Sequence, residues 1–247
     1  MSLRDLELWS ENLVGMHIDH STFGKAFEKI TEEYLKKYLK NLREKIKDKL
    51  GDKDFVYIAD ATGIKLDRLY RDVTSVGEKR KLGMHDKLSI LGEYYSTVGV
   101  ICISAGEWRS GYSYDSPSLV NMLSSTDIVP GKYLYADVGD DYFCYSLCFN
   151  KGLIPIIKQR RYKARGIRRK ALEIFSEELY KANRGIIEGI FGGLGTKRLL
   201  FSRFKKENMR RKHVIAMAIC HNLQTYMTIF CVFISIISTT YGIDDKI

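Results

Sequence analysis

A change of texture at Gly51–Asp54 constrains the fold of this 247-residue chain more than any other feature. Before it, apolar residues such as Leu35, Leu39, Leu42 and Ile46 recur at three- and four-residue steps, the period of an amphipathic helix. After it, short apolar runs of strand type come first and then alternate with helical stretches. This order predicts an α/β fold in which helices flank a mixed sheet, preceded by a small all-helical segment.

The predicted elements divide the chain into residues 1–50 and residues 51–247. In the first part, a helix over Leu3–Leu13 and a second helix opening at Asp19 or Ser21 are typical of a DNA-binding helix-turn-helix and equally of any helical hairpin. Strands are expected over Phe55–Ala59, Leu66–Val73, Val98–Ser104, Tyr133–Ala136 and Leu153–Ile157. Helices are expected over Tyr142–Phe149 and Ile167–Asn183, with an apolar core helix within Val214–Ile237.

Two of the predicted strands end alike, in Tyr57-Ile-Ala-Asp60 and in Leu134-Tyr-Ala-Asp137. A carboxylate at the end of a buried strand is costly to desolvate unless it caps a turn, pairs with a cation or binds a metal. For each aspartate alone, turn capping is the simplest interpretation. Asp140 and Asp141 compete for the role of Asp137, but they lie where a turn or a helix cap is expected.

A third acidic residue follows these two aspartates in chain order. Ile186, Ile187 and Ile190 form an apolar helical face, and Arg184 and Glu188 stand one turn apart beside it. Such a pair is usually a surface ion pair of small effect. The Arg184/Glu188 pair is of interest here because it follows two aspartates at the ends of predicted strands.

The order and spacing of these residues resemble the DDE transposases of bacterial and archaeal insertion sequences. The resemblance covers most of the chain from Phe55 to Tyr226, with 77 residues from Asp60 to Asp137 and 51 from Asp137 to Glu188. It rests on Ile58-Ala-Asp60-Ala-Thr-Gly63, Tyr114-Asp115-Ser116-Pro-Ser-Leu119, Leu134-Tyr-Ala-Asp137-Val-Gly139, Arg184-Gly-Ile-Ile-Glu188-Gly-Ile-Phe191 and His221-Asn-Leu223.

The resemblance implies a ribonuclease H-like catalytic domain whose acidic triad is Asp60, Asp137 and Glu188. Three carboxylates of this kind hold two Mg²⁺ or Mn²⁺ ions, one activating the attacking oxygen and the other stabilising the leaving oxygen. The implied reaction is cleavage of the element's ends by water, followed by attack of the freed 3′-hydroxyl on target DNA. The implied partners are the terminal inverted repeats, target DNA and a second copy of the chain in the synaptic complex.

The residues expected to handle DNA depart from the family's pattern. Many relatives carry a tyrosine three residues before the arginine and a lysine seven after the glutamate. Here those positions hold Lys181 and Gly195, while Tyr180 and Lys197 are their neighbours. One residue turns a helical side chain by about 100°, so the resemblance marks Tyr180 and Lys197 as DNA-binding candidates that are out of register. Arg184 is expected to steady a phosphate or Glu188.

The charge of the chain is concentrated in one region. Residues 151–212 carry 19 Lys+Arg and 5 Asp+Glu, whereas the whole chain has a net charge of +10. Arg160 and Arg161 lie in the densest basic run and are expected to contact phosphates, although such a run is also typical of a solvated face. Five cysteines without a CxxC pair, and a start that lacks a secretory signal, indicate a cytoplasmic, nucleoid-associated protein.

Two alternatives stay open from the sequence. The chain is short for the family, so it is also compatible with an inactive transposase remnant that only binds DNA. The apolar run Tyr226–Ile237, with a basic flank, is also compatible with a membrane anchor, although 12 residues fall short of the about 20 that span a bilayer.

Smaller features of the sequence receive structural interpretations. Loop and core packing is favoured for Trp108 and Arg109, with base stacking as the alternative. The glycines around Glu188 favour close packing on the sheet, or else close approach of a DNA backbone, and a helix end near Gly192. Structural or surface roles are expected for His17, His20, His85 and His213.

Overall fold

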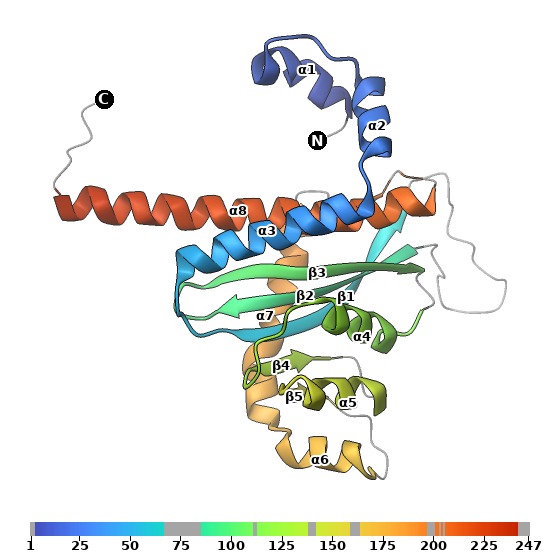
Figure 1. Cartoon of the computed structure of the whole chain (residues 1–247), viewed down its shortest axis with the longest axis vertical. Coiled ribbons are helices and arrows are strands. Elements are labelled where there is room, and N and C mark those ends of the chain that lie inside the picture. Colours follow the sequence, from blue (N-terminus) through green and yellow to red (C-terminus); the bar gives the residue numbers. More distant parts are fainter. Residues whose placement is uncertain are drawn as a thin grey trace.

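A mixed sheet forms the centre of the protein (Figure 1). The computed structural model describes residues 3–66, 85–110, 113–137, 142–158, 164–196, 201–202, 204 and 206–241. The strands are β1 (Val56–Leu66), β2 (His85–Tyr95), β3 (Val100–Ser110), β4 (Tyr133–Ala136), β5 (Ile154–Ile157) and β6 (Phe201–Ser202). The helices are α1 (Leu3–Val14), α2 (His20–Lys29), α3 (Glu32–Leu50), α4 (Ser116–Ser125), α5 (Tyr142–Asn150), α6 (Ile167–Ile174), α7 (Glu177–Thr196) and α8 (Glu207–Tyr241).

The five main strands lie in the order β3-β2-β1-β4-β5. β1, β2 and β3 form an antiparallel meander, while β4 and β5 run parallel to β1 on its other side. The two-residue strand β6 pairs with the far end of β1, on residues 65 and 66. The α/β class and the mixed sheet flanked by helices are therefore confirmed.

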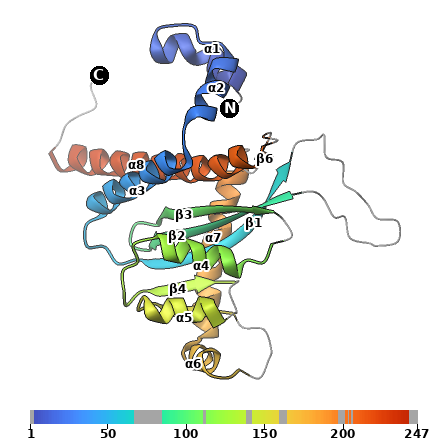
Figure 2. The same ribbon diagram turned by 45° about the vertical axis from the view of Figure 1, so that its right-hand side comes forward.

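Helices cover both faces of this sheet. Figures 1 and 2 show α4 and α5 on one face and α7 crossing the opposite face. α4 contacts β2 and β3, α5 contacts β5, and α7 contacts β1, β4 and β5. The core between these layers is built from fully buried side chains such as Tyr57, Leu91, Leu134 and Ile156. Burial of this apolar surface is the main favourable term in the stability of the fold.

α3 packs against β3 and α8, so it belongs to the body that contains the sheet. The predicted stripe is buried at Leu35, Leu39, Leu42, Ile46 and Leu50, as its spacing indicates. Tyr34 and Tyr38, each beside a leucine of the stripe in the sequence, are exposed. The part that stands away from the sheet in Figures 1 and 2 is the α1–α2 hairpin. Asp19 caps α2, as predicted, by accepting a hydrogen bond from the Ser21 amide at 2.8 Å.

α8 seals the exposed edge of β3 with polar side chains. Asn222 is fully buried; its Oδ1 accepts from the Ile103 amide at 2.7 Å, and its Nδ2 donates to the Ile103 carbonyl at 2.8 Å. Thr225 donates its hydroxyl to the Ile101 carbonyl at 3.0 Å. An unpaired strand edge invites association with other chains, so these bonds protect β3. The His221-Asn-Leu223 string thereby has a structural role in this fold.

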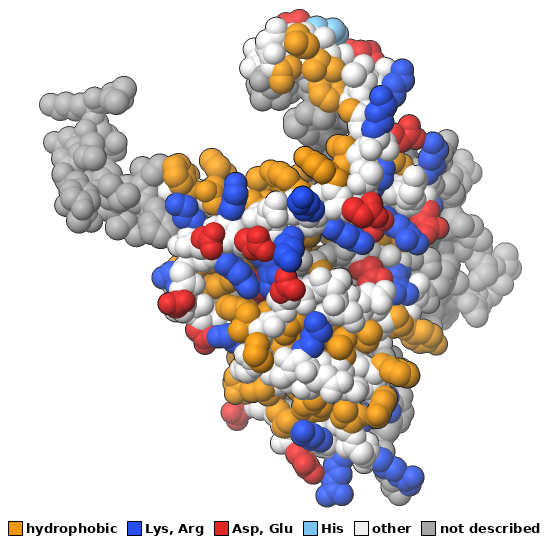
Figure 3. Space-filling view, in the orientation of Figure 1, with side chains coloured by type: hydrophobic (Ala, Val, Ile, Leu, Met, Phe, Trp, Pro, Cys, Tyr) orange, Lys and Arg blue, Asp and Glu red, His pale blue; other side chains and the backbone are white. Residues whose placement is uncertain are grey.

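Part of α8 is a core helix, as expected. Val214, Met217 and Ala218 are buried, and Val214 packs on Gly106 of β3. By length and composition alone, Glu207–Cys231 is apolar enough to cross a membrane, with 44% of its most apolar window buried inside the protein. Leu223, Met227 and Phe230 remain exposed, and Figure 3 shows apolar side chains along this helix.

Several predicted boundaries are wrong, and one predicted strand lies outside the described residues. The helix expected over Ile167–Asn183 is broken after Ile174, where α6 ends, and α7 begins at Glu177. Ser176 makes the break, because its Oγ accepts from the Leu179 amide at 3.3 Å in the manner of an N-cap. α7 then continues to Thr196, beyond the end expected near Gly192. The strand predicted over Leu66–Val73 falls almost wholly outside the described ranges.

Candidate active site

Asp60 lies in the middle of β1 rather than at its end. The sequence predicted a strand end there because Ala-Thr-Gly follows, but pairing with β2 continues as far as Lys65 and β1 ends at Leu66. The strand that ends beside Asp60 is the neighbouring β4, whose last residue, Ala136, pairs with Ala59. Asp60 and Asp137 therefore follow the last paired residues of two adjacent parallel strands. Adjacent strands lie about 4.8 Å apart, so the two aspartates begin from neighbouring backbone positions.

Asp137 is exposed, and its carboxylate is held from α7. The Tyr180 hydroxyl donates a hydrogen bond to Asp137 Oδ1 at 2.5 Å. The competing residues Asp140 and Asp141 lie outside the described residues. Asp137 is thus the aspartate that the structure places at the end of β4, next to Asp60.

Glu188, the third predicted carboxylate, lies on a helix that packs against the same two strands. α7 contacts β1 and β4, the two strands that carry the aspartates, and Glu188 is an exposed residue of that helix. Its negative charge acts on Asp60, together with the charges of Asp137 and Asp115. The charges of Asp137 and Glu188 thus both contribute to the raised pKa of Asp60, as minor causes beside its burial.

Burial and neighbouring negative charges make the Asp60 carboxyl a weaker acid than an ordinary aspartate. Removal of the carboxyl from water raises the pKa of Asp60 to about 6, from an ordinary value of 3.8. The value of about 6 includes a hydrogen bond from the Ala61 amide, which lowers the pKa, and the charges of Asp137, Asp115 and Glu188, which raise it. Carboxyls with strongly perturbed pKa values cluster at functional sites, which makes Asp60 a candidate site residue.

We expect Asp60→Asn to raise the melting temperature of the metal-free protein near neutral pH. Because the folded-state pKa lies above the unfolded value, the carboxyl favours folding below about pH 3.8 and costs stability as the pH rises through about 6. The gain in melting temperature should therefore be larger at about pH 7.5 than at about pH 5, as measured by differential scanning calorimetry. Equal gains at both pH values would contradict the raised pKa.

Sequence reasoning did not assign a role to Asp115, the fourth carboxylate near Asp60. Asp115 directly precedes α4 and forms an ion pair with Lys87 of β2. Lys87 also donates to the Ser113 carbonyl at 3.1 Å. A cation beside the site partly offsets the four negative charges. The signal was present in the Tyr114-Asp115-Ser116 string, but the partner Lys87 lies in a strand that was not predicted.

No protein-family model matches the chain, and no curated protein sequence matches it. The case for this site therefore rests on the arrangement of its own residues.

The predicted DNA-binding residues are only partly placed. Arg160, Arg161 and Lys197 lie outside the described residues. The backbone of Arg184 lies in α7, one turn before Glu188, and its side chain is not described. Basic side chains gather at the α6 end of the molecule in Figure 3, where Arg168, Arg169 and Lys170 lie on α6. The basic character predicted for this region is thus visible next to α7.

The glycines of α7 do not pack closely on the sheet. An added Cβ at Gly185, Gly189 or Gly192 would meet no atom within 4 Å. The favoured expectation of tight packing is therefore wrong for these three positions. They leave open space along α7 beside Glu188, and close approach of a DNA backbone stays a prediction.

Trp108 and Arg109 lie within β3 and border a hollow of about 890 Å³ that is lined by residues of α3, β3, α4 and α8. The guanidinium groups of Arg210 and Arg211 each lie 5.6 Å from the Trp108 ring centre. Ion pairs balance most of the charged residues around the hollow, including Lys40 with Asp127 and Arg211 with Glu207. This supports the structural interpretation of Trp108.

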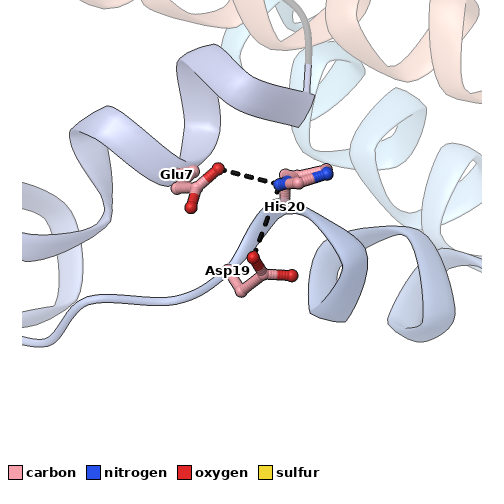
Figure 4. Close-up of side chains that lie close together, drawn as sticks. All are labelled: Glu7, Asp19 and His20. Atoms are coloured by element: carbon pink, nitrogen blue, oxygen red, sulfur yellow. Dashed lines mark hydrogen bonds and ion pairs between the residues drawn. The ribbon is translucent and has the colours of Figure 1, made fainter.

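A cluster in the α1–α2 hairpin brings together Glu7, Asp19 and His20 (Figure 4). Their ligand atoms lie within 4.8 Å of one another, and no other such group of three occurs among the described residues. His20 Nδ1 lies 2.9 Å from Glu7 and 3.4 Å from Asp19, so the histidine ties α1 to the start of α2. That tie explains the cluster and fits the structural role expected for His20.

Proposed function

We propose that this protein is a DDE transposase that acts on DNA by metal-dependent phosphoryl transfer. The observation that carries the proposal is that Asp60 and Asp137 follow the last mutually paired residues of β1 and β4, while α7, which carries Glu188, contacts both strands. The charges of Asp137 and Glu188 also act on Asp60. The site lies where two parallel strands stop pairing, a position at which α/β sheets commonly bind ligands. The strand order β3-β2-β1-β4-β5 is compatible with a ribonuclease H-like catalytic domain.

The three carboxylates fit a pair of divalent cations. They supply hard oxygen ligands of the kind that Mg²⁺ and Mn²⁺ prefer. The pKa of Asp60 is raised mainly by burial and further by the neighbouring carboxylates, and a bound cation would offset both effects. The triad is not among the groups with all ligand atoms within 4.8 Å of one another. Two ions about 4 Å apart, each about 2.1 Å from its oxygens, accept ligand atoms separated by as much as about 8 Å.

Each part of the chain then has a defined task. Asp60, Asp137 and Glu188 hold the ions, which when bound activate the attacking oxygen and stabilise the leaving oxygen. Arg184 and the basic residues from Arg160 to Lys170 attract the phosphates of the element's ends and of target DNA. The α1–α2 hairpin is the candidate for contacts with terminal-repeat DNA, and a second copy of the chain holds the other end.

Cleavage of terminal-repeat DNA tests this proposal. The full chain is incubated with a duplex that carries an inverted repeat from the DNA flanking its gene, with Mg²⁺, Mn²⁺ or EDTA. We expect nicks that leave 3′-hydroxyl groups, and joining of these ends to a plasmid, only with a divalent cation. Binding of the duplex in a gel shift without metal-dependent cleavage would refute the enzyme and leave the DNA-binding remnant.

The length and apolar character of α8 favour one further alternative, a basic protein anchored to a membrane. Burial of Val214, Met217 and Asn222 against the sheet favours the core helix instead. Extraction of cell membranes with carbonate distinguishes the two, since a core helix leaves the protein in the supernatant. Recovery in the membrane pellet, with folding controls, would support the anchor.

A further inference from the structure

We propose that the Tyr180 hydroxyl is a positioning group that orients Asp137 for a divalent cation. This rests on the proposed function, because it concerns the same carboxylate site. It gives Tyr180 a task inside the site in place of the DNA contact expected from the resemblance. The observation that carries it is the 2.5 Å hydrogen bond from the hydroxyl to Asp137 Oδ1.

The ring of Tyr180 is fixed by its surroundings. Tyr180 is only 5% exposed, and its ring packs on Phe175 with ring centres 5.9 Å apart. The Lys158 ammonium lies over the ring, 6.0 Å from its centre. A side chain held in this way presents its hydroxyl from a constant position, which a flexible surface residue does not.

The register of α7 explains why the tyrosine reaches this place. Lys181, which stands where many relatives of the resembled family have tyrosine, is exposed and pairs with Glu177 at 3.0 Å. The shift of one residue turns the side chain by about 100°. At position 180 the tyrosine faces β4, two turns before Glu188 on the same helix. In this proposal α7 thus supplies the Glu188 carboxylate and, through Tyr180, orients the Asp137 carboxylate.

The bond has a physical consequence for Asp137. Its side chain is exposed at the end of β4, where an unrestrained carboxylate rotates freely. A hydroxyl-to-carboxylate bond of 2.5 Å is short and charge-assisted, so it selects one orientation. In this proposal Oδ2 of Asp137 is the oxygen that binds the cation, and binding costs less side-chain entropy because the hydrogen bond has already fixed the carboxylate. Loss of a hydrogen bond to a metal-binding carboxylate typically lowers metal affinity or activity by about 10- to 100-fold.

Binding of Mn²⁺ alone to the full chain tests the role of Tyr180. Free Mn²⁺ is followed by electron paramagnetic resonance for the wild type, Asp60→Asn, Tyr180→Phe, Asp137→Asn and the double variant Tyr180→Phe/Asp137→Asn. We expect Tyr180→Phe to weaken binding by about 10- to 100-fold, and to weaken it no further in the Asp137→Asn background. Tyr135→Phe is the matched control, since it removes a phenolic hydroxyl from a buried ring on β4 and is expected to leave affinity unchanged.

The outcomes separate the two proposals. A Tyr180→Phe variant that binds Mn²⁺ within twofold of the wild type would overturn the role of Tyr180 while leaving the metal site intact. Equal weakening in the wild-type and Asp137→Asn backgrounds would assign the effect to packing and also overturn it. A wild-type protein that binds Mn²⁺ no better than Asp60→Asn would overturn both the positioning role and the proposed function.

Discussion

Asp60→Asn is expected to abolish metal-dependent DNA cleavage, lowering the rate by on the order of 10³-fold or more. The substitution keeps the size of the side chain but removes a negative charge at the point where β1 loses its β4 neighbour. A neutral amide is a poor ligand for Mg²⁺, so the ions lose a shared support. Asp137→Asn and Glu188→Gln should have effects of the same order, and double variants should lose little more, because the three groups act as a unit. Single-turnover cleavage of terminal-repeat DNA measures all of these.

Asp54→Asn is the matched control for this prediction. Asp54 is an exposed carboxylate just before β1 that pairs with Lys132, at the opposite end of the strand from the β6 pairing. Loss of a surface pair has little effect on stability, so this variant should cleave at the wild-type rate. Loss of cleavage by Asp54→Asn would point to general damage to β1. Full cleavage by Asp60→Asn would refute the triad.

The parts of the site that the sequence predicted best were those marked by a pattern in neighbouring residues. Apolar runs located β4 without error and β5 within one residue, so Asp137 was found at a true strand end. The pairing of β1 with β4, which places Asp60 beside Asp137, joins residues 77 positions apart. No local pattern encodes such pairing. The prediction of convergence therefore came from a resemblance in order and spacing.

β2 was missed because its charged residues look like loop residues. Asp86, Lys87, Gly92 and Glu93 interrupt the apolar run that would otherwise predict a strand. Asp86 is buried and accepts two hydrogen bonds from Arg210, at 3.0 and 3.1 Å. Arg210 belongs to α8, far from β2 in the sequence. A local sequence pattern therefore cannot show that folding buries the charge of Asp86 and pairs it.

The same limit applies to Tyr180. Sequence reasoning treated it as a displaced DNA-contact residue, since a helical pattern shows which residues share a face but not what that face meets. The break at Ser176 sets where α7 begins, and Ser followed by two glutamates is a recognisable start signal. The contact with Asp137 then depends on how α7 docks on β4, which only tertiary packing determines.

Arg43→Met is expected to lower the free energy of unfolding by about 3 kcal/mol. Glu93 is fully buried in β2, and Arg43 of α3 donates to its Oε1 from Nε at 3.0 Å and from Nη2. Arg43 also donates to the Asp127 carbonyl at 2.9 Å, so the residue joins α3, the sheet and the segment after α4. Methionine keeps the apolar stem but leaves the Glu93 carboxylate buried without its main partner. For a chain of this size the melting temperature should fall by roughly 6–12 °C.

The double variant Arg43→Met/Glu93→Gln separates charge burial from packing. A neutral glutamine still accepts the hydrogen bond that Tyr95 donates at 3.2 Å, and Lys47, 3.2 Å from Glu93, is exposed enough to turn toward solvent. Because no uncompensated charge remains buried, the double variant should be more stable than Arg43→Met alone. Urea unfolding followed by circular dichroism measures both. A loss below about 1 kcal/mol in the single variant would mean that Lys47 and Tyr95 stabilise Glu93 without Arg43, and that α3 is held on the sheet mainly by its apolar stripe.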